Sequence, residues 1–494
     1  MKIPYISTQR RRDAETQGKH AAKISWQFTA GIIRAFELRS VLQDDTYQFC
    51  QFSFAPLRLC VTVICLSSFV LCYPHLSRAA EVRTLTLDQA LEIAVARNRD
   101  ILKAREFYNQ VQGKYVEERS AALPQITLTG QLSRQQDDSQ KILTGGFIPT
   151  RQDTGGAELG ISQVVYSWGK VGAAIRAADI GFRTADERLR MARQGTYRDV
   201  STAFYDILLA RELHAISRQN LEQKSRHLDE AQRKYAAGVA TDYDVLAAEV
   251  SVQNARPDLI RTGNQLRSTK DRLRFILALE EDVEVAGELE LPPAALPSYE
   301  ESLAVARKRR PELEELRRRK EIAGELVTIA NADDKPRLDI KGGYGWRRLE
   351  AGDVRGDGQD WNVGLYLSFP FFDGLKTRGK VAQAESERHA LEIDEAKQSD
   401  AISLEIRDAL NHVREAQEIV SALTGTVAQA ERLLTMAEKG YELGVKIRLE
   451  VDDAELNLNQ AKGNLALARR DYLAALVNLN WTTGVLGEGN VSAP

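Results

Sequence analysis

Apolar residues recur every seven positions in two long stretches of the chain, which lie about two hundred residues apart. A repeat of seven is slightly shorter than two helical turns, so helices that carry it wind around each other with a left hand. A glycine follows each stretch, and a second seven-residue pattern begins beyond it. The repeating residues of the first two stretches are Val200, Ile207, His214, Leu221, Leu228 and Tyr235, and Ile406, Val413, Val420, Val427, Leu434 and Tyr441.

These patterns predict one long antiparallel helical hairpin in each half of the chain. The first hairpin is expected over 170–280, with its turn near Gly238, and the second over 375–480, with its turn near Gly444. The helix that leads to the first turn would be roughly 100 Å long, several times the length of an ordinary globular helix. Pro257 is expected to kink or interrupt the first returning helix.

Four shorter segments alternate apolar with small or polar residues. This is the period of a β-strand that has one face in apolar surroundings and the other in water. A length of about nine to eleven residues suits a strand that crosses a membrane. Trp346, Trp361, Phe371 and Phe372 lie near strand ends, where interfacial aromatic residues are common. The strands are expected at about 124–134, 157–167, 336–347 and 360–370.

Polar, glycine-rich segments separate the strands of each pair and predict surface loops at about 135–156 and 350–359. A proline-rich stretch separates the two halves. The expected division is an N-terminal extension with a signal peptide at 1–80, a first repeat at 81–290, a linker at 291–298, a second repeat at 299–484 and a tail at 485–494.

The first 80 residues are expected to be a processed leader. Residues 59–72 form an apolar core of signal-peptide length, and 77–79 (Ser-Arg-Ala) provide the small residues of a cleavage site. A start codon nearer Leu57, a membrane anchor and lipidation at Cys72 are the alternatives.

The composition excludes several classes of function. The 494 residues carry 67 Lys and Arg against 70 Asp and Glu, so no excess of positive charge indicates nucleic acid as a partner. After residue 80 no apolar run reaches about 18 residues, so a spanning helix is not expected there. All four cysteines lie before residue 80, so neither disulfides nor thiol chemistry is expected in the mature chain.

Four strands are too few to close a barrel in a membrane. An open sheet edge in lipid leaves backbone groups without partners, each at a cost of several kcal/mol. If the strands cross a membrane, they must therefore pair with strands of further copies, which predicts a homo-oligomer. The alternative is a periplasmic coiled-coil scaffold or adaptor without a pore, in which the strands form a small soluble sheet.

The order of helix, strand pair and long hairpin, occurring twice over roughly residues 82–484, resembles the TolC family of outer membrane efflux channels. Each motif is weak alone, and their duplicated order is specific. The motifs are Leu87-Asp88-Gln89-Ala90-Leu91 with Ala96-Arg97-Asn98, Leu123-Pro124-Gln125-Ile126, Lys335-Pro336-Arg337-Leu338, Tyr166-Ser167-Trp168-Gly169, Phe371-Phe372-Asp373-Gly374, Tyr235-Ala236-Ala237-Gly238 and Tyr441-Glu442-Leu443-Gly444.

The resemblance implies an α+β membrane protein, a TolC-type channel-tunnel in which a homotrimer forms a twelve-strand β-barrel continuous with an α-helical barrel. Such a protein would lie in the bacterial outer membrane, in contact with its lipid, and extend into the periplasm. It would dock a periplasmic adaptor protein and an inner-membrane pump, in a tripartite efflux or type I secretion system. It would be a passive conduit and not an enzyme, without a cofactor or metal.

The resemblance also places candidate site residues at the hairpin turns. The aperture or gate candidates are Asp244, Tyr441, Lys446, Glu450 and Asp453, and the adaptor-docking candidates are Tyr235, Gly238 and Gly444. A ring of carboxylates from several chains would favour cations. Simpler roles are also available, because acidic residues at helix starts cap free amides. The tyrosines could be packing residues and the glycines turn residues.

Other motifs indicate structure. His214 lies on the seven-residue pattern and is expected to be a seam residue. His227 has no Cys or His partner at metal-binding spacing. The glycines at 342–345 lie in a predicted strand, so a phosphate loop is not expected. The arginine-rich segment 307–319 is expected to form a solvated helix face.

Overall fold

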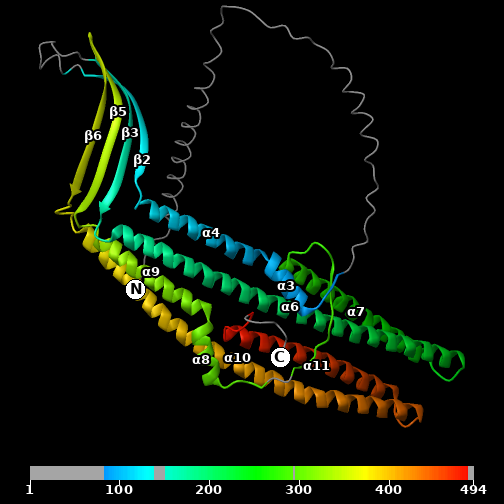
Figure 1. Ribbon diagram of the computed structural model, residues 1–494. Coiled ribbons are helices and arrows are strands. Elements are labelled where there is room, and N and C mark those ends of the chain that lie inside the picture. The colour runs from blue at the N-terminus through cyan, green and yellow to red at the C-terminus, as the bar shows by residue number, and fades with distance from the viewer. Residues whose placement is uncertain (1–82, 138, 140–150, 293–294, 488–494) are drawn as a thin grey trace, which may run out of the picture. The chain divides into compact units, whose positions relative to one another are not determined.

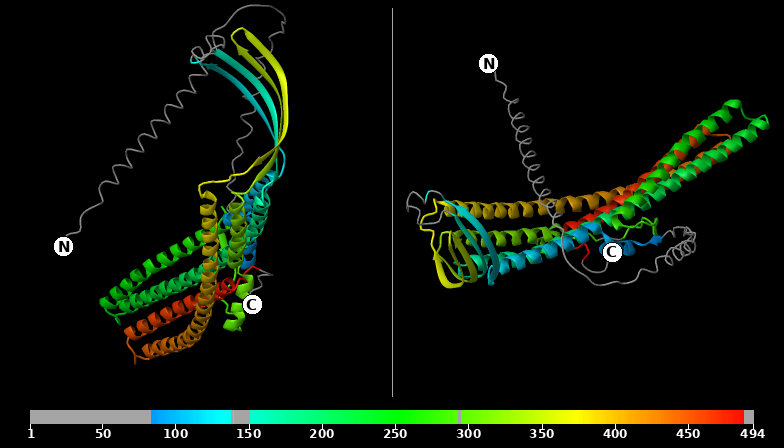
Figure 2. Two further views of the ribbon diagram at one scale, coloured as in Figure 1. Left: turned by 90° about the vertical axis from the view of Figure 1, so that its left-hand side faces the viewer. Right: turned by 90° about the horizontal axis from the view of Figure 1, so that it is seen from above.

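Long helices and one larger sheet make up residues 83–137, 139, 151–292 and 295–487, which a computed structural model describes (Figures 1 and 2). The predicted leader, most of the first loop, two linker residues and the end of the tail lie outside the described residues. The elements are β1 (Arg83–Leu85), α3 (Leu87–Arg97), α4 (Arg99–Ser120), β2 (Gln125–Gln136), β3 (Arg151–Tyr166), α6 (Lys170–Ala236), α7 (Asp242–Leu277), β4 (Val283–Val285), α8 (Tyr299–Arg309), α9 (Pro311–Asn331), β5 (Arg337–Ala351), β6 (Val354–Ser368), α10 (Lys376–Glu442) and α11 (Arg448–Thr482).

The two hairpins are built alike. Helices α6 and α10 each contain 67 residues, and each returns as a shorter helix, α7 or α11. The turns contain Gly238 and Gly444 at φ 76° and 71°, a left-handed backbone that glycine adopts without steric cost. Pro257 does not interrupt α7, which is helical on both sides of it. Val252 and Ala255 are buried beside it, so tertiary packing maintains the helix although one backbone donor is missing.

The larger sheet has four antiparallel strands in the order β2-β3-β5-β6. The central pair, β3 and β5, joins the strand pair of the first half to that of the second. Strands β2 and β6 are the edges, and within the described chain each has one neighbour in this sheet. Figure 2 shows that the sheet is strongly curved.

The strands are longer than predicted, and two predicted loops are wrong in part. Strand β3 already begins at Arg151, and β5 and β6 extend to a tight turn at Gly352 and Asp353. Glycine and polar residues in these segments suggested loops. In the structure, however, the first part of β3 and the first part of β6 both pair with β5, and Gly352 takes a positive φ of 62° at the turn. Backbone pairing has outweighed local propensity here.

The two larger of the four apolar clusters among the described residues join most of the helices. One joins α3, α6, α7 and the small parallel sheet of β1 and β4, and it includes Ala466 and Leu473 of α11. The other joins α8, α9, α10 and α11. Because α11 contributes to both cores, the second hairpin is packed against the first half of the chain.

Candidate functional site

One face of the four-stranded sheet is apolar and exposed. The register sets Leu128 opposite Leu159, Leu159 opposite Tyr344 and Tyr344 opposite Trp361, and all four side chains are exposed. The row two residues along contains Ile126, Ile161, Gly342 and Val363. A continuous apolar band that none of the described residues covers indicates a face that lies against lipid or a partner.

The opposite face of the sheet is polar. One row across it consists of Thr129, Glu158, Gly345 and Asp360. Next to this row the Glu158 side chain lies over Gly343, where an added Cβ would lie 2.5 Å from its Oε1 atom, so a larger residue there would displace the end of this side chain. The strict alternation predicted from the sequence therefore produces a two-faced sheet, as in a strand set that separates lipid from water.

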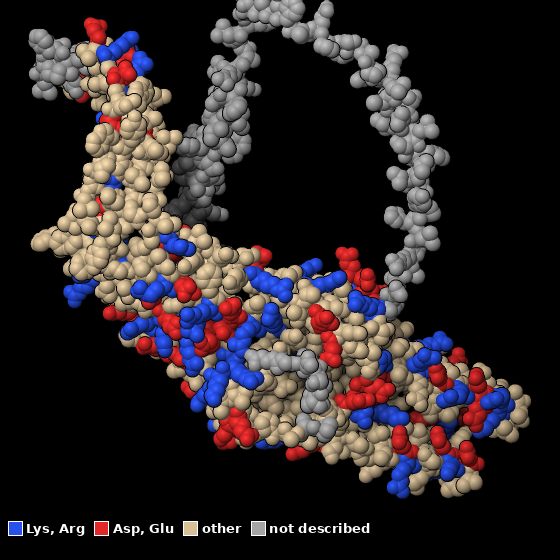
Figure 3. Space-filling view, viewed as in Figure 1, with Lys and Arg blue, Asp and Glu red and all other residues tan. Residues whose placement is uncertain are grey.

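Charged side chains are also distributed unevenly between the sheet and the helices. Figure 3 shows that the middle of the sheet carries few charged side chains on the visible face, whereas charges of both signs cover the helices and the far end of the sheet. Within residues 83–137, 139, 151–292 and 295–487, no helix has both the length and the apolar character needed to cross a membrane.

At the first hairpin turn, Asp244 is part of a helix cap. Its Oδ2 atom accepts hydrogen bonds from the backbone N–H and the hydroxyl of Thr241, at 2.8 and 2.7 Å. The Thr241 hydroxyl in turn accepts from the backbone N–H of Asp244, at 3.3 Å. The backbone and side-chain hydrogen bonds from Thr241 lower the pKa of Asp244. Tyr235 and Gly238 are exposed beside it.

At the second turn, Glu450 combines a cap with an ion pair. It accepts hydrogen bonds from Lys446 Nζ at 2.9 Å and from the backbone N–H of Ile447 at 3.1 Å. The Lys446 bond first, and then the backbone bond, lower the pKa of this carboxyl. The N-cap here is Ile447, which has no side-chain acceptor, so only half of the reciprocal cap of the first turn exists.

Tyr441 connects the two turns. The Nζ atom of Lys234 on α6 lies 5.1 Å from the centre of its ring, and the guanidinium carbon of Arg448 lies 5.8 Å from it. Both distances fit cation–π contacts. The structure thus brings Tyr441, Lys446 and Glu450 to one turn, while Asp244 lies on the other turn. Asp453 is exposed one helical turn beyond Glu450, and Gly444 is exposed in the turn itself.

Both turns expose large apolar side chains. This is uncommon at a solvated loop and fits contact with another protein. The most exposed are Val239, Tyr243, Leu443, Val445, Ile447 and Leu449.

The sequence interpretation missed a buried polar cluster between α6 and α11. Glu455 has 1% of its side chain exposed and lies 2.7 Å from both Lys224 Nζ and His227 Nε2. Gln223 donates a third hydrogen bond, at 2.5 Å, and Lys224 also pairs with Asp452 at 2.9 Å. Burial raises the pKa of Glu455, but the hydrogen bonds from His227 and Lys224 outweigh burial and lower that pKa to about 2.

A signal for this cluster was present in the sequence. Lys224 lies three residues after Leu221, which belongs to the seven-residue pattern of the first half. The corresponding position in the second half, three residues after Val427, is Ala430. A long cation at a seam position indicates a buried acidic partner. His214, in contrast, lies in the seam as predicted, with Nδ1 3.3 Å from the hydroxyl of Thr262 on α7.

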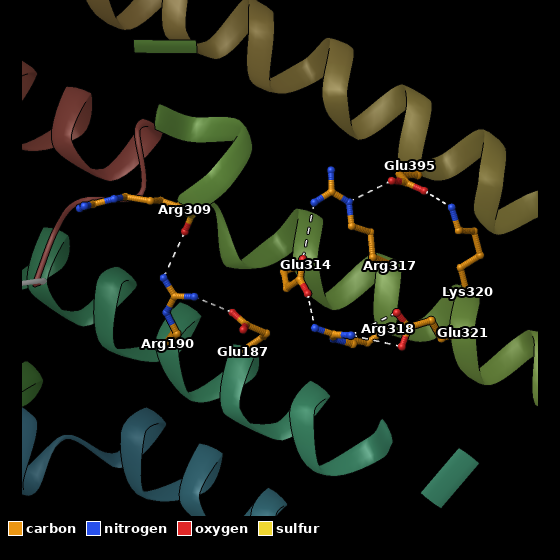
Figure 4. Close-up of polar contacts among 9 residues, drawn as sticks. All are labelled: Glu187, Arg190, Arg309, Glu314, Arg317, Arg318, Lys320, Glu321 and Glu395. Carbon is orange, nitrogen blue, oxygen red and sulfur yellow. Dashed lines mark hydrogen bonds and ion pairs between the residues drawn. The ribbon is translucent and has the colours of Figure 1, made fainter. Parts of the chain in front are cut away.

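The prediction that the arginine-rich segment 307–319 forms a solvated helix face is wrong in part, because Arg317 pairs with a residue of another helix. Arg317 and Lys320 of α9 both pair with Glu395 of α10, at 3.1 and 2.5 Å (Figure 4). Arg318 pairs with two acidic residues of its own helix. The pairs of Arg317 and Lys320 with Glu395 join α9 to α10, whereas those of Arg318 lie within α9.

The described residues contain no group of three or more His, Cys, Asp or Glu side chains that could hold a metal ion. The clustered charges of α6, α9, α10 and α11 are ion pairs between helices and within them.

Comparisons with known proteins agree with this architecture. The family model described as "Outer membrane efflux protein" matches residues 90–279 and 303–485. The outer membrane protein TolC of Vibrio cholerae is 24% identical over 382 residues, which cover 76% of this chain and 84% of that protein. The alkaline protease secretion protein AprF of Pseudomonas aeruginosa is 26% identical over 389 residues, which cover 76% and 79%.

Among solved structures, the CmeC outer membrane channel of Campylobacter jejuni aligns with a TM-score of 0.72 at 16% identity, covering 81% of this chain and 85% of that one. These likenesses support a channel over a scaffold without a pore. The family match over both halves, the two-faced sheet and the paired long hairpins together show that the chain belongs to the outer membrane efflux protein family, the outer membrane channels that extend into the periplasm.

Proposed function

We propose that three copies of the chain assemble around one axis, so that their sheets close a twelve-strand barrel and their hairpins form a helical tunnel below it. Each repeat, 81–290 and 299–484, contributes one strand pair and one hairpin. The observation that carries the proposal is the open, two-faced sheet. Within the described residues, its edge strands β2 and β6 each have one neighbour in the sheet, and the backbone groups left unpaired on the other side would cost several kcal/mol each in lipid. Twelve strands are enough to close a barrel.

The proposed assembly is a passive conduit and not an enzyme. It carries cargo from the periplasm or cytoplasm to the exterior as the outer part of a tripartite efflux or type I secretion system. An inner-membrane pump supplies the energy, and a periplasmic adaptor protein docks at the hairpin turns, with Tyr235, Gly238 and Gly444 as its contacts. The exposed apolar side chains of both turns support this docking surface.

The same turns form the proposed periplasmic aperture. Asp244, Tyr441, Lys446, Glu450 and Asp453 would recur in each copy and line the narrow end of the tunnel. Glu450 and Asp453 supply negative charge there, which favours cations over anions. The Lys446–Glu450 pair is partly exposed and is therefore a weak contact that opens easily.

The assembly is tested with purified full-length protein in detergent. The expected result is an oligomer of three chains that dissociates only on heating, and discrete channels in a planar bilayer. A monomer that is soluble without detergent would overturn the proposal.

The aperture is tested with Glu450→Ala and Asp453→Ala in the same bilayer assay. We expect a changed single-channel conductance and a weaker preference for cations. Glu418→Ala, which removes an exposed carboxylate of α10 far from the turn, is the matched control and should leave both unchanged. Channels of the two turn variants that behave like the control would overturn the gate assignment while leaving the channel intact.

A further inference from the structure

The apolar face of the sheet ends in charged residues at the end that lies away from the helices. Along β5 the residues of this face are, in order, Leu338, Ile340, Gly342, Tyr344, Trp346, Arg348 and Glu350. The distance along the strand from Leu338 to Trp346 is about 27 Å, at ~3.4 Å per residue. This is close to the ~25 Å height of the apolar band of a membrane barrel. The charged residues therefore begin where the lipid tails end, and Figure 3 shows side chains of both signs gathered there.

One row across this end of the sheet has an arginine on each edge strand and a carboxylate on each central strand. The register sets Arg134 opposite Asp153, Asp153 opposite Glu350 and Glu350 opposite Arg355. On every strand this row lies six residues beyond the apolar row that contains Tyr344. Six is an even number, so the charged row is on the apolar face of the sheet.

Asp153 holds two arginines on this face. It accepts hydrogen bonds from Nε and Nη2 of Arg134 at 2.7 and 2.9 Å, and from Nη2 of Arg151 at 3.1 Å. The side chain of Asp153 is 28% exposed, whereas those of Arg134 and Arg151 are 67% and 56% exposed. The carboxylate therefore lies beneath the two guanidinium groups. Arg134 uses two of its five N–H donors in this pair, and the others remain for a further acceptor.

Glu350 repeats this arrangement on the second strand pair. It lies 2.7 Å from Nη2 of Arg355 and 3.6 Å from Nη2 of Arg348, and both arginines are more exposed than the carboxylate. The arginine cluster of the sheet is defined by these four side chains, one from each strand: Arg134, Arg151, Arg348 and Arg355.

The arginine cluster carries more positive charge than its acidic neighbours balance. The acidic residues of these rows are Asp153, Glu350 and Asp357, which accepts a hydrogen bond from Nε1 of Trp346 at 3.4 Å. One positive charge per chain is therefore left over. Between the two groups lies a hollow of about 410 Å³, which Leu132 lines together with charged residues of both groups. Leu132 is 92% exposed, so the hollow joins an apolar side to a cationic one.

We propose that the arginine cluster binds the phosphate groups of the glycolipid that forms the outer leaflet of the outer membrane, with an acyl chain against Leu132. The helices extend into the periplasm, so the opposite end of the sheet meets the outer leaflet. Guanidinium groups bind phosphate oxygens with two parallel hydrogen bonds, and basic clusters at the membrane interface attract anionic head groups. The inference goes beyond the proposed conduit, because it needs the sheet to lie in the outer membrane and no particular cargo, pump or adaptor.

Binding of diphosphoryl lipid A to the purified full-length channel tests this inference, with native mass spectrometry as the readout. Arg134→Gln with Arg355→Gln removes two positive charges and leaves each carboxylate with one arginine. This double variant should bind lipid A at least tenfold more weakly. Lys341→Gln with Arg347→Gln is the matched control, since it removes two exposed positive charges from the opposite, polar face of β5. The control should stay within twofold of the parent.

Three further measurements separate the possible outcomes. Monophosphoryl lipid A, which lacks one phosphate, should bind the parent at least threefold more weakly than the diphosphoryl form. Phosphatidylglycerol should also bind more weakly, and tighter binding of this phospholipid would overturn the assignment to the glycolipid. Arg134→Lys with Arg355→Lys keeps the charge but loses the planar fork, so its affinity should fall between those of the parent and the glutamine variant. It covers the case in which the glutamine variant fails to fold, and parent-like binding by it would then count against the inference.

Equal loss of lipid A binding in the glutamine variant and its matched control would overturn the inference. A parent oligomer that binds no lipid A would overturn it as well and leave the proposed assembly standing. A parent that is a monomer without detergent would instead overturn the assembly.

Discussion

Replacing Glu455 by Gln measures how strongly the two hairpins of one chain are joined. The carboxylate accepts hydrogen bonds from Gln223, Lys224 and His227 at 2.5, 2.7 and 2.7 Å, with 1% of the side chain exposed. Glutamine has nearly the same size but no charge. Lys224 would keep only Asp452 as an ionic partner, and its half-buried ammonium would be poorly compensated.

The expected magnitude follows from the pKa of this carboxyl. Burial alone would raise that pKa. The hydrogen bonds from His227 and Lys224 outweigh burial, so the pKa falls from 4.5 to about 2. At about 1.4 kcal/mol per pKa unit, the difference corresponds to about 3 kcal/mol of folding stability at neutral pH. Removal of one partner from a buried ion pair costs roughly 3–5 kcal/mol, which agrees. Because the folded state has the lower pKa, this stability is present above the unfolded value of 4.5 and is lost as the pH falls toward about 2.

The assay is chemical denaturation of the detergent-solubilised channel, followed by far-ultraviolet circular dichroism at neutral pH and near the folded pKa. At neutral pH the variant should lose about 3 kcal/mol of unfolding free energy, and the difference should shrink in acid. Glu249→Gln changes the exposed equivalent residue of the first half and should stay within about 0.5 kcal/mol of the parent. Equal stability of the Glu455→Gln protein and the parent at neutral pH would refute the reasoning.

Two further predictions concern the hairpin turns, both measured by the same denaturation assay. Thr241→Ala removes the reciprocal cap with Asp244 and should cost about 1 kcal/mol, whereas Ile447→Thr supplies the missing acceptor at the second turn and should gain a similar amount. The opposite order of these two effects would show that the caps do not stabilise the turns. Gly444→Ala forces an L-residue to φ 71° and should cost about 1–2 kcal/mol, although nothing lies within 4 Å of the added Cβ. Gly425→Ala, in the interior of α10 with equal space, should instead stabilise by about 0.5–1 kcal/mol, and a matching loss there would contradict the backbone argument.

Much of the architecture was accessible from the sequence because its signals are periodic. A seven-residue apolar pattern sustained over many turns predicts long helices that wind around each other. Helices α6 and α10 of the structure each contain 67 residues. Alternation in four short segments predicted a two-faced sheet, and the register confirms it in rows such as Leu128, Leu159, Tyr344 and Trp361. The strand ends were predicted poorly, because glycine-rich segments pair when a neighbouring strand is available.

The role of each turn residue was less accessible. Asp244 and Glu450 were expected either to gate the tunnel or to cap helices, and the hydrogen bonds of Thr241 and Ile447 with these residues demonstrate the capping. Capping does not exclude a place at the aperture, since both carboxylates remain at the turns. Sequence spacing identifies the helix start, but it carries no information about which other chain faces it.

The sequence by itself determined the presence of the long helices and the strands, since each follows from neighbours a few residues apart, and the match between stretches about two hundred residues apart determined their duplication. Only the tertiary structure decided that Glu455 meets Lys224 and His227, and that Glu395 binds the cations of α9. The physical reason is that an amphipathic helix specifies which face is buried and leaves open which partner buries it. That choice depends on how the two halves pack together.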